Sequence, residues 1–143
     1  MKLREVMSNT VVRIHPNESV SVAARMLEHY NIGMLPVCGS DGRVCGLITD
    51  RDIVTRCLAA ERSPKTTAVR EVMTANVIAA RPDMDAALAA SLMGRAQIRR
   101  LPVMENGKLC GMVSLGDLAR KEETSIDAGD ALSEISSHLS SRG

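Results

Sequence analysis

The chain has 143 residues, of which 45% are hydrophobic and 24% charged, and its formal net charge at pH 7 is +1. This length suits one domain or two small halves that share a core. The near-zero charge and the single aromatic residue, Tyr30, argue against nucleic-acid binding, which needs a basic surface and stacking platforms. No apolar run is long enough to span a bilayer, and the first residues do not form a signal peptide, so we expect a cytoplasmic protein without a membrane partner.

One segment of the chain occurs twice, with an offset of 66 positions that becomes 65 after one residue is lost in a turn. The matching pairs are Arg4–Met7 with Arg70–Met73, Leu35–Val37 with Leu101–Val103, and Gly46–Asp52 with Gly111–Asp117. We therefore divide the chain into repeat 1 (1–60), a linker (61–69), repeat 2 (70–121) and a tail (122–143).

Each repeat reads as β-α-β-β-α from its hydrophobic periodicity and its turn residues. In repeat 1 we expect strands at 11–14, 34–38 and 43–49 and helices at 19–30 and 50–60. In repeat 2 we expect strands at 76–80, 100–105 and 108–114 and helices at 85–96 and from 115 to about 121. The expected fold is α+β, with the two repeats packed through their sheets around a pseudo-two-fold axis and matched clefts between them.

The tail can form an amphipathic helix, because its apolar residues recur at spacings of three and four. These residues are Ala128, Leu132, Ile135 and Leu139. The apolar face needs a partner, which is either the same chain or another subunit.

Each repeat ends in a strand that leads to a hydroxyl residue, with an aspartate three positions later at a helix start. These motifs are Thr49–Asp52 and Ser114–Asp117. Free N–H groups at a helix start suit a phosphate, and a carboxylate can accept hydrogen bonds from two ribose hydroxyls. The same spacing is also that of a helix capping box, which satisfies its own N–H groups and binds nothing.

The order, spacing and duplication of these motifs resemble a tandem pair of cystathionine β-synthase (CBS) domains, also called a Bateman module, over residues 1–120. The resemblance rests on the Val-Met-Ser/Thr openings, the Leu-Pro-Val strands and the Gly-φ-φ-Thr/Ser-x-x-Asp ends. It implies a stand-alone regulatory module that binds AMP, ADP or ATP, with S-adenosylmethionine as a further candidate, and signals to an unknown effector protein. It also implies a homodimer.

The resemblance assigns Asp52 with Thr49, and Asp117 with Ser114, to the ribose and phosphate of two ligand sites. The residues implied to face the Asp117 site are Ser8, Asn9, Thr10, Ile32 and Gly33. Those implied to face the Asp52 site are Thr74, Ala75, Asn76, Ile98 and Arg99.

Basic residues distinguish the two sites. Arg100 matches a position where nucleotide-binding relatives present a cation to phosphate. A charge-assisted hydrogen bond there is worth about 1.5–3 kcal/mol, so we expect the Asp117 site to bind phosphate better. Arg51 could also reach a phosphate or could be an exposed helix residue, and Arg99 is equally compatible with a solvated strand start.

Two other classes of function are weighed against this one. The sequence has no nucleophile–base pair, so we do not expect an enzyme. The four cysteines, Cys38, Cys45, Cys57 and Cys110, form no C-x-x-C pair, which argues for core packing and against zinc. Cys38 and Cys45 flank one hairpin and could meet if oxidised, so a redox- or metal-responsive CBS protein without nucleotide binding is the alternative function.

Overall fold

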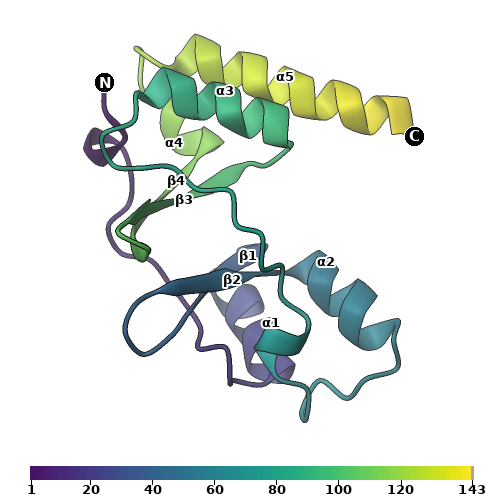
Figure 1. The fold of residues 1–143 in the computed structure, drawn as a ribbon. Helices are drawn as coiled ribbons and strands as arrows, with labels where there is room; N and C mark the ends of the chain where they lie inside the picture. Colours follow the sequence, from purple (N-terminus) through teal and green to yellow (C-terminus); the bar gives the residue numbers. More distant parts are fainter. Residues whose placement is uncertain (143) are drawn as a thin grey trace. The chain divides into compact units, whose positions relative to one another are not determined.

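The computed structural model describes the backbone of residues 1–142 and the side chains of residues 1–137. The chain is α+β and forms two compact units (Figure 1). The first-repeat unit consists of Val12–Val77. The second-repeat unit consists of Met1–Val11 together with the chain from Ile78 onward. None of the helices in the described part of the chain combines the length and hydropathy that a membrane span requires.

The first-repeat unit is built on a two-stranded antiparallel hairpin with helical segments around it. Its elements are α1 (Val20–Tyr30), β1 (Met34–Cys38), β2 (Val44–Thr49), α2 (Asp50–Asp52), the π-helical segment η2 (Ile53–Leu58) and the 3-10 turn η3 (Val69–Glu71). The hydroxyl of Ser19 caps α1 by accepting the N–H of Val22, and α1 ends at Asn31 in the left-handed conformation. The helix expected over 50–60 is α-helical only over Asp50–Asp52, as α2. It continues as the π-helical segment η2, which ends at Leu58.

The second-repeat unit has the same plan and one additional helix. Its elements are η1 (Leu3–Glu5), α3 (Ala86–Ala96), β3 (Arg100–Glu105), β4 (Lys108–Ser114), α4 (Leu115–Ala119) and α5 (Ser125–Arg142). The hairpin turn contains Asn106 and Gly107, both with positive φ, as this tight turn requires. The strands and the helix that precedes them agree with the periodicity of the sequence.

The third strand expected in each repeat is reduced to a single residue. Ile14 forms an isolated parallel bridge with Val37 of β1, donating to the carbonyl of Pro36 and accepting from the N–H of Cys38. The next parallel hydrogen bonds would need N–H groups from Pro36 on one side and Pro16 on the other, and proline has none. Ala80 is confined in the same way between Pro82 and Pro102. The predicted strands at 11–14 and 76–80 are therefore wrong in extent.

The opening segments, residues 3–8 of repeat 1 and residues 69–74 at the junction of the linker and repeat 2, each complete the unit built from the other repeat. In the second-repeat unit, the N–H of Leu3 donates to Met84 O at 2.9 Å, and the side chain of Leu3 is fully buried. In the first-repeat unit, the N–H of Val69 donates to Glu18 O at 2.8 Å, and Val69 is likewise fully buried. The compact units thus differ from the linear division at 60 and 70.

The tail helix α5 packs on α3 and α4 of its own unit, so the partner of its apolar face is in the same chain (Figure 1). Ala128, Ala131 and Ile135 are buried there, whereas Leu132 is 43% exposed. The side chain of Leu139, also expected on this face, lies outside the described residues. The helices approach closely at Gly94, where an added β-carbon would lie 3.0 Å from Ala131 Cα.

Candidate functional site

Both Thr/Ser-x-x-Asp motifs lie where the second strand of a hairpin passes into a helix. Thr49 Oγ1 accepts the N–H of Asp52 at 3.0 Å, and Asp52 Oδ2 accepts the N–H of Thr49 at 3.1 Å. Ser114 Oγ and Asp117 Oδ2 form the same pair of hydrogen bonds, at 3.0 and 2.9 Å. Both motifs are therefore capping boxes, so the predicted capping geometry is confirmed. A carboxylate offers about four acceptor positions, so capping alone leaves capacity for a ligand.

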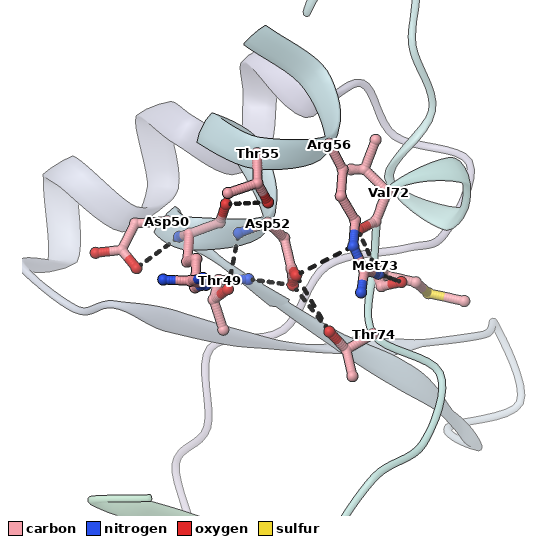
Figure 2. Close-up of polar contacts among 9 residues, drawn as sticks. Thr49, Asp50, Asp52, Thr55, Arg56, Val72, Met73 and Thr74 are labelled. Atoms are coloured by element: carbon pink, nitrogen blue, oxygen red, sulfur yellow. Dashed lines mark hydrogen bonds and ion pairs between the residues drawn. The ribbon is translucent and has the colours of Figure 1, made fainter. Parts of the chain in front are cut away.

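The carboxylate of Asp52 is additionally bound by other parts of its own unit (Figure 2). The hydroxyl of Thr74 donates to Oδ1 at 3.1 Å and to Oδ2 at 3.2 Å, and Arg56 Nε lies 3.9 Å from Oδ1. Arg56 Nη1 in turn donates to the carbonyls of Val72 and Met73. Asp52 is only 6% exposed, so its carboxylate holds the opening segment of repeat 2 against the end of β2.

The carboxylate of Asp117 is more open. Apart from its capping contacts with Ser114, Asp117 pairs with Arg120 alone among the described residues. Arg120 Nη2 lies 2.6 Å from Asp117 Oδ1. The side chain of Asp117 is 26% exposed and that of Arg120 is 74% exposed. Ser8 matches Thr74 in the repeat, but its hydroxyl donates to Thr10 O at 3.2 Å and not to Asp117. Solvent, or a ligand, can therefore reach Asp117.

A second feature of the Asp117 motif is the cation beside it. Arg100 at the start of β3 is the register partner of Ser114 at the end of β4. Side chains of directly paired residues lie on the same face of a sheet, with β-carbons about 4.5–5.5 Å apart. The equivalent partner of Thr49 is Met34. The Asp117 motif therefore combines an acceptor for hydroxyl groups with a cation for an anionic group, and the Asp52 motif does not have this cation at its strand partner.

The family model that describes the CBS domain matches residues 3–59 and 69–124. The chain belongs to the CBS domain family. The CBS domain-containing protein YhcV of Bacillus subtilis is 37% identical over 134 residues, which cover 94% of this chain and 94% of YhcV. Such relatives are small proteins that consist of a CBS pair.

Two solved CBS structures carry ligands of different kinds. Hypoxic Response Protein I with two coordinated zinc ions is 32% identical, with a TM-score of 0.77 over 84% of this chain and 98% of that chain. A CBS domain pair in complex with 5′-methylthioadenosine and S-adenosyl-L-methionine is 30% identical, with a TM-score of 0.73 over 84% of this chain and 94% of that chain.

The remaining candidate residues are divided between the two compact units. Ser8, Asn9, Thr10, Ile98, Arg99 and Arg100 belong to the unit of Asp117, and Ile32, Gly33, Arg51, Thr74, Ala75 and Asn76 to the unit of Asp52. That Ile32 and Gly33 face the Asp117 site, and Ile98 and Arg99 the Asp52 site, stays a prediction. Within each unit, antiparallel pairing brings the start of the first strand beside the end of the second. The N–H of Asp50 accordingly donates to Gly33 O, and that of Leu115 to Arg99 O.

Sequence reasoning missed Arg120 as a neighbour of the candidate site. Its signal was the spacing of three positions from Asp117, which places two oppositely charged side chains on one helical face. Repeat 1 has Thr55 at the matching position, so a comparison of residues shared by the two repeats does not single out Arg120.

The cysteines contribute little to either site. Cys38 and Cys57 are buried, and burial raises the pKa of the Cys38 and Cys110 thiols, which lowers the thiolate fraction needed for redox chemistry or metal binding. Within the described part of the chain no three His, Cys, Asp or Glu residues gather closely enough to hold a metal ion.

Proposed function

We propose that this CBS protein is a regulatory module that binds an adenine nucleotide at the Ser114–Asp117 motif. The observation that carries the proposal is the partly exposed carboxylate of Asp117, placed beside the strand position of Arg100. Asp117 would accept the ribose hydroxyls, and Arg100 would bind the phosphate. The related CBS pair in complex with two adenosyl compounds supports this ligand class.

The energetics favour Asp117 over Asp52 as the ligand-binding carboxylate. To receive a ribose at Asp117, the protein has only to loosen an exposed ion pair, which is worth about 0.2–1 kcal/mol. To receive one at Asp52, it has to break the contact with Thr74 in a buried setting. The half-buried hydroxyl of Thr74 would then lose a hydrogen bond to a charged group, which is worth about 1.5–3 kcal/mol. We therefore propose a single preferred ligand motif, with Asp52 serving mainly to hold the fold together.

Regulation requires that the ligand bind two states of the protein with unequal affinity. The proposed readers of that difference are a second copy of this chain and an effector protein. A related CBS protein has been crystallised as a hexamer, which supports assembly as one route by which occupancy is passed on.

The test is titration calorimetry of the full chain with AMP, ADP, ATP and S-adenosylmethionine, followed by the Asp117→Asn variant. Asparagine keeps the shape and a capping oxygen but loses the charge that strengthens bonds to ribose hydroxyls. A loss of at least about 1.4 kcal/mol, or tenfold in affinity, is expected. Asp83→Asn is the matched control, because Asp83 is an exposed aspartate of the same unit in an ion pair with Arg81.

Two results would count against the proposal. If the wild-type chain bound no adenosyl compound, the proposed function would be wrong. If Asp117→Asn and Asp83→Asn bound the nucleotide as tightly as the wild type, the function would stand but the site would be elsewhere.

A further inference from the structure

The guanidinium of Arg120 lies over the Ser114–Asp117 motif. Arg120 Nη2 is 2.6 Å from Asp117 Oδ1, at the exposed side of that carboxylate. The side chain also extends back along the first turn of α4, toward Gly116. A β-carbon added to Gly116 would lie 3.8 Å from Arg120 Nη1 and 3.6 Å from Ser114 Oγ. Arg120 therefore lies beside Oδ1, the oxygen of Asp117 that the capping hydrogen bond from Ser114 N leaves free.

The first-repeat unit holds its arginine differently: Arg56 Nε lies 3.9 Å from Asp52 Oδ1, and its Nη1 donates to the carbonyls of Val72 and Met73. Where repeat 2 has Gly116 and Arg120, repeat 1 has Arg51 and Thr55. The hydroxyl of Thr55 donates to the carbonyl of Arg51 at 2.8 Å, within the helix, and does not contact Asp52 (Figure 2). The absence of a side chain at Gly116 leaves room for the guanidinium, and Arg100 adds a second cation on the strand side.

The two kinds of adenosyl ligand make different demands on Arg120. A ribose that binds Asp117 Oδ1 competes with the guanidinium of Arg120 for the acceptor positions of that oxygen. A ligand that carries a phosphate offers the guanidinium a new anionic partner, to which it can bind in a bidentate manner. A ligand without a phosphate, such as 5′-methylthioadenosine, leaves the guanidinium in water.

On the basis of the function proposed above, we propose that Arg120 is a specificity-determining residue for phosphate. In the free protein it pairs with Asp117, and in the complex it transfers to the phosphate of the ligand. The exchange favours nucleoside phosphates over neutral adenosyl compounds, and it favours ADP over AMP because Arg100 and Arg120 together bind more than one phosphate group. Arg56, the arginine beside Asp52, is held by two backbone carbonyls and is not free to make this exchange.

The experiment compares ADP with 5′-methylthioadenosine by titration calorimetry at fixed ionic strength. We expect the wild-type chain to prefer ADP. In Arg120→Ala, we expect ADP affinity to fall at least tenfold while 5′-methylthioadenosine affinity stays level or rises up to about fivefold, because Asp117 no longer has a competing partner. The ratio of the ADP affinity to the 5′-methylthioadenosine affinity therefore falls at least tenfold.

Two further variants make the result specific. Arg120→Lys keeps the charge but loses the planar fork, so its ratio should lie between those of wild type and Arg120→Ala. Arg81→Ala should keep the wild-type ratio, since Arg81 is an equally exposed arginine that pairs with a nearby aspartate of the same unit. Thermal unfolding of each variant checks that the fold is retained.

Each contrary result has a distinct meaning. A wild-type chain that binds ADP and 5′-methylthioadenosine equally well overturns the role of Arg120 and leaves the proposed function in place. So does an Arg120→Ala variant that loses both ligands to the same extent, or neither. A wild-type chain that binds no adenosyl compound overturns the proposed function and this inference together.

Discussion

Asp52 and Asp117 occupy matching positions and form the same capping box, yet their surroundings make them different groups. The difference depends on one residue in each opening segment. The hydroxyl of Thr74 reaches the Asp52 carboxylate, whereas that of Ser8 turns to the carbonyl of Thr10. Asp52 is therefore buried and held by three segments of its unit, and Asp117 remains partly exposed.

At this scale we predict that Thr74→Val destabilises the protein and that Ser8→Ala does not. Valine has nearly the shape of threonine but leaves the buried carboxylate without its hydroxyl donor, which should lower the free energy of unfolding by about 1.5–3 kcal/mol. Ser8 is exposed, so removing its hydroxyl should change stability by less than about 0.5 kcal/mol. Urea unfolding of both variants gives the comparison, and equal effects would show that the Thr74 contact contributes nothing particular.

At the scale of elements, the two repeats differ in that the first helix of repeat 2, α3, packs against α5. Gly94 of α3 allows the backbone of α5 to approach, and Ala90 one turn earlier is fully buried. Repeat 1 has Glu28 and Ala24 at these positions of α1, and both are exposed. The small residues of α3 thus provide the surface on which the tail helix packs, and α1 has a charged residue in place of the glycine.

We predict opposite effects for two Gly→Ala changes in this pair of helices. Both replace a mid-helix glycine, so each gains about 0.8–1.0 kcal/mol in helix propensity. An added β-carbon at Gly129 on α5 would have no atom within 4 Å besides the adjoining backbone of its own helix, so Gly129→Ala should keep that gain. Gly94→Ala brings the β-carbon against Ala131 and should instead lose about 1–3 kcal/mol from overpacking.

Thermal and urea unfolding measure both effects, and limited proteolysis of α5 shows whether the tail has detached. If Gly94→Ala proved as stabilising as Gly129→Ala, α5 would not pack on α3 as closely as described.

At the scale of the whole molecule, the two compact units do not follow the order of the chain. Each unit has its own buried core, and each core includes an apolar residue from the opening of the other repeat. Leu3 completes one core, and Val69 and Val72 complete the other, all with no exposed surface. A cut at the boundary between the linear repeats would therefore remove part of a core.

We predict that residues 12–77 fold as a fragment and that residues 1–66, a fragment of equal length, do not. The second fragment lacks Val69 and Val72, and burial of each contributes about 1.5–3 kcal/mol. Their sum is comparable to the whole stability of a small domain. Circular dichroism during urea unfolding should show a cooperative transition for 12–77 alone. Equal cooperativity in both fragments would mean that the opening segments are dispensable.

The sequence by itself determined the duplication, the hairpins, the first helix of each repeat and the two capped Thr/Ser-x-x-Asp motifs. These features depend on residues close together in the chain, where periodicity, turn residues and capping residues act directly. The tertiary structure decided which opening segment completes which unit, why Ile14 and Ala80 do not extend into strands, where α5 packs, and which aspartate stays open. Those outcomes depend on contacts between distant residues, such as Thr74 with Asp52 and Gly94 with Ala131. Local patterns carry no information on such contacts, because they form only when separate segments are brought together by folding.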